Sequence, residues 1–181
     1  PKMLLGFFTA SVSIAIGFCE QDGLLSLDDP IEKFFPAYVE KEGAIRHGTT
    51  VRELLMMKTT IPGFNWFRPE VTDRTVTYFE KAPIKLSGTL FDYDSCGSYM
   101  LDVIVERVTG KPFMDYMYEK MLHKLDFSKN VKCIESPDGF SWGGSGVMCT
   151  SRDLAAFANL VMHKGEHNGV QLLPRDYCEA A

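Results

Sequence analysis

A long run of uncharged residues near the start of the chain constrains its fold more than any other sequence feature. Residues 3–19 read MLLGFFTASVSIAIGFC, seventeen residues without a charged side chain. A helix of that composition is either buried on all sides in a globular domain or is a membrane or signal segment. Hydroxyl side chains dilute the run, and it continues without a cleavage-like break into Glu20. We therefore expect a buried central helix, with a membrane or targeting segment as the alternative.

Composition and charge narrow the class of protein further. The chain has 181 residues, of which 45% are hydrophobic and 24% charged, so it can bury a core of its own. We treat residues 1–181 as a single domain. Nineteen Lys and Arg against 24 Asp and Glu leave a formal net charge of −5. Because nucleic-acid binding needs a basic surface and these Lys and Arg residues form no cluster, we expect no nucleic-acid partner.

Helix start and stop signals predict a mainly helical chain with little strand. The central helix should end at Gly23, because glycine can adopt the left-handed conformation that closes a helix. Thr50 with Glu53 three residues later has the pattern of a capping box. Ser95 and Ser151 are the N-caps expected for two later helices. The predicted helices after the first are 28–35, 51–57, 95–109, 112–121, 152–164 and a last one from Pro174.

The spacing of cysteines and histidines argues against a metal site and a disulfide framework. The Met and Tyr residues at helical spacing after Pro112 are typical of core packing and not of a cofactor site, so we expect no cofactor. The five cysteines are odd in number and include no C-x-x-C pair, which is typical of reduced thiols and favours a cytoplasmic compartment. Cys149 has no neighbouring histidine that would lower its pKa, so a cysteine nucleophile is not expected. We expect the four histidines at the surface, without metal-ligand partners.

Four sequence blocks occur in an order that is typical of one protein family. The first is EQDGLLSLDDP at 20–30, and the second is VRELLMMKTT at 51–60, leading to PG at 62–63. The third is FDYDS at 91–95 with TGKPF at 109–113, and the fourth is GGSGV at 143–147 with LLP at 172–174. Together they resemble the serine β-lactamase and penicillin-binding-protein family, in its class-C and esterase-like branch.

This resemblance implies a fold class. The chain would be mainly α, the helical region of the α/β fold of β-lactamases and DD-peptidases, with most of the antiparallel sheet missing. The family's K-T-G or H-x-G motif lies on a sheet strand, whose backbone N–H contributes to the oxyanion hole. We expect no segment of this chain to supply that strand, since family order places it beyond residue 181.

The family's reaction is acyl transfer by a serine whose hydroxyl is activated by the lysine of S-x-x-K. No serine of this chain has a lysine three residues later. In one alignment, Lys2 is the family's general base and the nucleophilic serine lies two residues before Pro1. In the other, aligned without gaps from Gly23, Thr9 and Gly6 occupy the lysine and serine positions and the chain is catalytically silent.

Tyr93 and Ser95 match the family's Y-x-N motif. The resemblance implies that Tyr93 assists proton transfer beside the lysine, and that Ser95, in place of asparagine, positions the substrate through a hydrogen bond. A phenol has a pKa near ~10, so this role needs an adjacent cation. The alternative is a half-buried tyrosine at a helix entry, with Ser95 as the cap. Trp142 beside Gly143 is either a pocket wall or turn packing.

Two functions from different classes follow, with a third that is weaker. The first is a part of a serine hydrolase that acts on an ester, amide or peptide carbonyl of a small-molecule or peptide substrate, through an acyl-enzyme. The second is a catalytically silent binding or interaction module that keeps the pocket. The third is a membrane-tethered domain with 3–19 as its anchor, which the polar dilution of that run disfavours. The sequence does not determine the oligomeric state.

Overall fold

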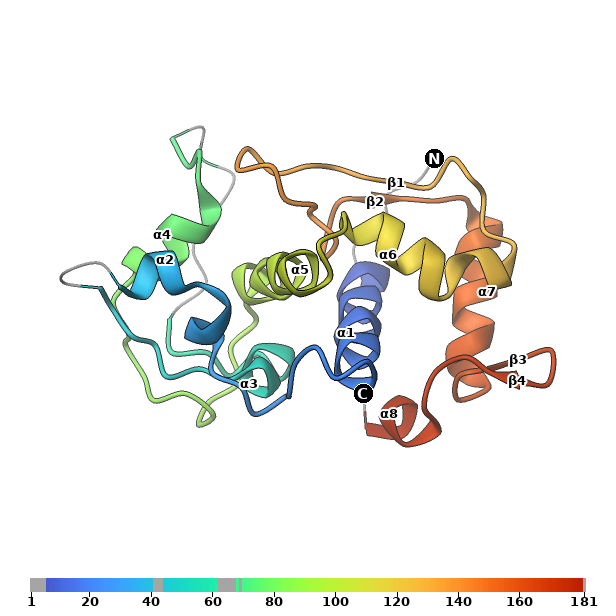
Figure 1. Ribbon diagram of the computed structural model, residues 1–181, viewed down its shortest axis with the longest axis horizontal. Coiled ribbons are helices and arrows are strands. Elements are labelled where there is room, and N and C mark those ends of the chain that lie inside the picture. Colours follow the sequence, from blue (N-terminus) through green and yellow to red (C-terminus); the bar gives the residue numbers. More distant parts are fainter. Residues whose placement is uncertain (1–5, 41–43, 62–67, 69, 181) are drawn as a thin grey trace.

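The computed structural model describes residues 6–40, 44–61, 68 and 70–180. Figure 1 shows α1 at the centre of the view, with α5 beside it, α2, α3 and α4 on one side and α7 on the other. The helices are α1 (Gly6–Gln21), η1 (Ile31–Phe34), α2 (Pro36–Val39), α3 (Val51–Leu55), α4 (Arg74–Glu80), α5 (Ser95–Thr109), α6 (Phe113–Lys120), η2 (Leu122–Leu125), α7 (Ser151–Met162) and α8 (Arg175–Ala180).

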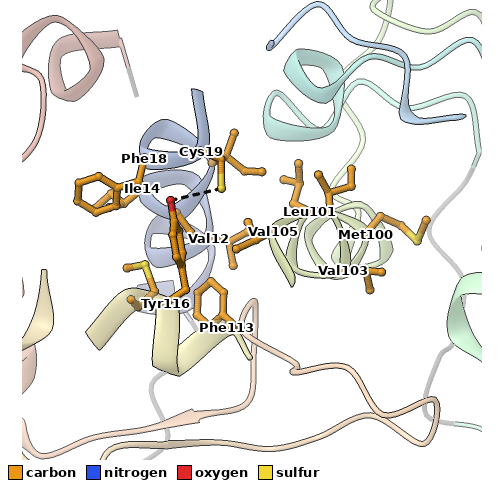
Figure 2. Close-up of a cluster of buried hydrophobic side chains, with 14 of the residues drawn as sticks. Val12, Ile14, Phe18, Cys19, Met100, Leu101, Val103, Val105, Phe113 and Tyr116 are labelled. Carbon is orange, nitrogen blue, oxygen red and sulfur yellow. Dashed lines mark hydrogen bonds between the residues drawn. The ribbon is translucent and has the colours of Figure 1, made fainter. Parts of the chain in front are cut away.

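The uncharged run near the start forms α1, and this helix is part of the hydrophobic core. Val12, Ala15, Ile16 and Cys19 are each fully buried, which confirms the expectation of a buried helix. Figure 2 shows α1 packed against α5 and α6, with the Cys19 thiol hydrogen-bonded to the Tyr116 hydroxyl at 3.6 Å. Within the described parts of the chain, no helix is long and apolar enough to cross a membrane.

The second central helix, α5, is buried along most of its length. Every residue from Cys96 to Val105 is buried, and Gly110 ends the helix in the left-handed conformation at φ +67°. The predicted span of 95–109 is therefore confirmed. The prediction of Ser95 as N-cap is wrong, because the cap is Asp94, whose side chain accepts a hydrogen bond from the Cys96 backbone N–H at 2.8 Å.

A stripe of polar side chains runs along α5 at four-residue spacing and binds the loop at 141–146. Asp102 is fully buried and accepts a hydrogen bond from the Gly144 backbone N–H at 2.9 Å. One turn later, Glu106 accepts from the backbone N–H of Ser141 at 3.2 Å and of Phe113 at 2.8 Å. The stripe comprises the N-cap Asp94 together with Ser98, Asp102 and Glu106; the first three are buried and Glu106 is half-buried.

Two capping boxes fix the starts of α3 and α7. The Thr50 hydroxyl accepts from Glu53 N–H while the Glu53 carboxylate accepts from Thr50 N–H, as the sequence predicts. For α7 the prediction of Ser151 as cap is wrong. Thr150 is the cap and Asp153 completes the box, because both of its bonds to Thr150 follow the same reciprocal pattern.

The described part of the chain contains only two small sheets, each of two antiparallel strands. Strand β1 (Lys132–Cys133) pairs with β2 (Val147–Met148), and β3 (Glu166–His167) pairs with β4 (Val170–Gln171). The second pair forms a hairpin between α7 and α8. The described residues are thus mainly helical with little strand, which agrees with the expected helical part of the β-lactamase and DD-peptidase fold.

Candidate functional site

The segment that enters α5 carries the two residues matched to the Y-x-N motif. Tyr93 is 60% exposed, whereas Asp94, the next residue, is 1% exposed. Asp94 has extended backbone at φ −132° and ψ 98°, so neighbouring side chains point to opposite sides of the chain. Ser95 is the first residue of α5 and is half-buried. The segment therefore presents a phenol and a hydroxyl on either side of a buried carboxyl group.

The buried carboxyl group of Asp94 is held by hydrogen bonds from two directions. Its Oδ1 accepts from the Cys96 N–H at 2.8 Å, and its Oδ2 accepts from the Thr59 hydroxyl at 3.1 Å. Burial raises the pKa of Asp94, while the hydrogen bonds from the Gly97 and Cys96 backbone and from Thr59 lower it in part. Thr59 is itself fully buried. Asp94 is thus an anchor that connects α5 to the segment following α3.

That segment, residues 57–60, also holds the loop that precedes Tyr93. Asp92 N–H donates to Met57 C=O at 3.0 Å, and Gly88 N–H donates to Lys58 C=O at 2.8 Å. Farther back in the loop, Ile84 N–H donates to Thr60 C=O at 2.9 Å. Residues 57–60 therefore hold the loop from 84 to 94 in place through hydrogen bonds along its length.

A buried histidine, His47, contacts residue 60 of this segment, whereas the sequence predicted that it lies at the surface. His47 is 4% exposed, and its Nδ1 lies 3.0 Å from Oγ1 of Thr60. Its backbone N–H donates to Glu32 Oε1 at 2.8 Å, and its ring lies 5.3 Å from that of Tyr78. Burial lowers the pKa of His47, and the Glu32 carboxylate opposes this shift in part. The surface prediction for His47 is wrong, because its partners come from three separate segments.

The other candidate residues do not join the Tyr93 segment. Lys2 lies outside the described residues, so both alignments of the nucleophile helix stay predictions. Trp142 packs beneath the Arg74 guanidinium at 4.4 Å, and Gly143 lies against Asp102 of α5, which is turn packing. Burial raises the pKa of Cys149 and raises the pKa of Cys19 to about 11, the opposite of what a nucleophilic thiol requires.

Two further observations concern ligands. No group of three or more His, Cys, Asp or Glu residues in the described ranges is placed to hold a metal ion. A cavity of about 570 Å³ lies between the start of α7 and the β1–β2 pair, lined by residues of 128–132 and 148–153. This cavity is built from other segments than the loop that carries Tyr93.

Solved structures define the class of fold. A putative 6-aminohexanoate-dimer hydrolase from Bacillus anthracis matches with a TM-score of 0.80 at 17% identity, over 99% of this chain and 52% of its own. An octameric penicillin-binding protein homologue from Pyrococcus abyssi matches with a TM-score of 0.75 at 23% identity, over 98% of this chain and 47% of its own. At these identities the match concerns the fold, which is that of β-lactamase-like and penicillin-binding proteins.

The family follows from the sequence comparison. The Beta-lactamase family model matches residues 10–176, and the chain belongs to this family. It is 22% identical to the 6-aminohexanoate-dimer hydrolase of Paenarthrobacter ureafaciens, over 98% of this chain and 50% of that protein. It is 28% identical to an N-acetylmuramyl-L-alanine amidase of Bacillus subtilis, over 56% of this chain and 26% of that protein. The chain thus spans about half the length of the first relative.

Proposed function

We propose that the protein to which this chain belongs is a serine hydrolase that cleaves an amide or ester through an acyl-enzyme. The observation that carries this proposal is the Tyr93-x-Ser95 segment, anchored at the start of a buried helix in a chain of the beta-lactamase family. Amides are the first substrates to test, because the names of two relatives, a dimer hydrolase of 6-aminohexanoate and a muramyl-alanine amidase, refer to amide substrates.

The proposed mechanism assigns a separate role to each residue. A serine two residues before Pro1 attacks the substrate carbonyl carbon, and Lys2 takes its hydroxyl proton. The tetrahedral intermediate then collapses, the leaving amine or alcohol accepts a proton through Lys2 and Tyr93, and the acyl group stays on the serine. Water repeats these steps and releases the acid. Ser95 donates a hydrogen bond to the bound substrate.

A labelling experiment tests the proposal. The 181-residue chain and a chain extended by both its upstream and its downstream coding sequence, so that the nucleophile and the oxyanion-hole strand are both included, are incubated with a fluorophosphonate or a fluorescent penicillin. The extended chain should label and the 181-residue chain should not, and Lys2→Ala should abolish the labelling. Tyr93→Phe should slow it by about 10²-fold or more, the usual contribution of a proton-transfer group. Ser145→Ala, in the fourth sequence block, serves as the serine control.

The alternative is a silent module, favoured by the absence of S-x-x-K from the sequence. An extended chain that folds, as shown by circular dichroism, but takes up neither probe would refute the hydrolase and support this alternative. A missing serine upstream of Pro1 would have the same meaning.

A further inference from the structure

The two residues that flank Tyr93 in the sequence are both hydrogen-bonded to the segment 57–60. On its N-terminal side, Asp92 N–H donates to Met57 C=O at 3.0 Å. On its C-terminal side, Asp94 Oδ2 accepts from the Thr59 hydroxyl at 3.1 Å. The two residues of the 57–60 segment that make these bonds, Met57 and Thr59, are two positions apart in the sequence. Their partners, Asp92 and Asp94, are also two positions apart. Tyr93 is therefore fixed at both of its peptide neighbours while its ring extends into solvent.

The anchor on the C-terminal side has little freedom to move. Asp94 is 1% exposed, and its other oxygen, Oδ1, accepts from Cys96 N–H at 2.8 Å. The surrounding space is filled, because a Cβ atom added at Gly97 would lie 3.1 Å from Asp94 Oδ2 and 3.5 Å from Cγ2 of Thr59. Neither Asp94 nor Thr59 can rotate without breaking a buried hydrogen bond, which costs about 1–3 kcal/mol for the group left unpaired.

We infer that Thr59 and Asp94 are positioning residues for Tyr93 and Ser95. Their hydrogen bond holds the extended backbone of Asp94, which sets the direction of the exposed Tyr93 phenol beside the half-buried Ser95 at the first position of α5, before any substrate binds. Such preorganisation matters in acyl transfer because a displacement of about 1 Å can cost about 10²-fold in rate. The catalytic part of this inference depends on the proposed function, whereas its structural part does not.

The structural part is tested on the 181-residue chain by ¹⁹F NMR of protein containing 3-fluorotyrosine. Seven tyrosines give seven signals, and Tyr93→Phe identifies the one that belongs to Tyr93. Thr59→Val removes the hydroxyl but keeps the side-chain shape, so the Tyr93 signal should shift towards that of free 3-fluorotyrosine. Thr59→Ser should restore it. Asp94→Asn, which keeps an acceptor oxygen, should give a smaller shift.

The matched control is Thr150→Val in α7. Thr150 makes the same kind of bond, a hydroxyl contacting Asp153 Oδ2 at 2.7 Å, but it caps a different helix. This variant should lose a similar amount of stability in urea and leave the Tyr93 signal unchanged. An unchanged Tyr93 signal in Thr59→Val would overturn the inference, and so would an equal shift in Thr150→Val.

The catalytic part is tested in the extended chain on an amide or ester that it hydrolyses. Thr59→Val should lower kcat by about 10-fold or more, with a smaller change in KM, and should move the alkaline limb of the pH profile. Thr59→Ser should restore both, and Thr150→Val should change neither. An extended chain without acyl-transfer activity refutes the proposed function, while the NMR result still decides whether Thr59 positions Tyr93. A normal kcat in Thr59→Val, with the NMR shift present, would refute the catalytic part alone.

Discussion

Gly143 should be one of the positions in this fold least tolerant of a larger residue. A Cβ atom at this position would overlap Oδ1 of Asp102 and lie 2.9 Å from Cε1 of Phe113. Both of these side chains are fully buried. Asp102 cannot swing aside without losing its hydrogen bond from Gly144 N–H, which is 2.9 Å long. Gly143→Ala must therefore move the loop away from α5 or break this contact.

The expected loss in the free energy of unfolding is the sum of two costs. Overpacking in a filled core costs about 1–3 kcal/mol. A buried carboxyl group that loses its partner adds about 1–3 kcal/mol. We expect Gly143→Ala to lower the free energy of unfolding by about 2–6 kcal/mol. With a urea m-value of about 2 kcal/mol per molar, the unfolding midpoint should fall by roughly 1–3 M.

The assay is urea unfolding followed by circular dichroism, with Gly97→Ala as the control. Gly97 lies inside α5, and its added Cβ would meet Asp94 Oδ2 at 3.1 Å and Leu54 Cδ2 at 3.3 Å. A small cost from these tight contacts is offset by the gain of about 1 kcal/mol for replacing a helical glycine by alanine. The midpoint of this variant should therefore stay within about 0.5 M of the original, which is about 1 kcal/mol at the same m-value.

A double variant separates this explanation from a general weakness of the loop. Asp102→Ala removes the obstructing oxygen, so Gly143→Ala should cost less in that background, by about 1–2 kcal/mol. Strict additivity of the two losses would refute the argument, as would a Gly143→Ala variant as stable as the original chain.

Two further predictions concern pH. Burial lowers the pKa of His47, so the folded state favours the neutral imidazole. The free energy that neutral His47 contributes to folding is present above about pH 6.5, the pKa of histidine in the unfolded chain. This contribution is lost as the pH falls below that value. His47→Asn should therefore have a flatter dependence of the urea midpoint on pH between 7 and 5, and an unchanged slope in this variant would contradict the reasoning. Burial raises the pKa of Asp102 well above its ordinary value, so its contribution is present below about pH 4 and is lost as the pH rises. Asp102→Asn should remove that loss, and an unchanged decline in midpoint between pH 4 and 8 would contradict the assignment.

Local sequence signals predicted the helix boundaries well where one residue acts on its near neighbours. The Thr50 capping box and the Gly110 stop are contacts within a single turn, and both are present as expected. The two wrong caps are also local. At α5 the acceptor is Asp94, one residue earlier than the predicted Ser95. At α7 the pattern Thr150-x-x-Asp153 was visible in the sequence and identifies the true cap.

Contacts between distant segments could not be predicted in the same way. A polar residue every fourth position along α5 is the usual mark of a solvent-facing stripe on an amphipathic helix. Here Asp102 is buried and Glu106 half-buried, because backbone N–H groups of the 141–146 loop need acceptors and these two carboxylates provide them. His47 was misjudged for the same reason, since its partners Glu32 and Thr60 lie 15 and 13 residues away.

The candidate site combines both kinds of information. The sequence identifies Tyr93 and Ser95 through a motif, but it contains no sign that Asp94 between them is buried or that Thr59 is its partner, 35 residues earlier. The motif indicates which groups could take part in acyl transfer, whereas the buried bond explains how an exposed phenol on a loop could have a defined direction. A tyrosine with 60% exposure has few contacts of its own to orient it, so its orientation must come from its neighbours in the chain. For this reason we expect substitutions at Thr59 to affect Tyr93 more than substitutions of surface residues close to its ring.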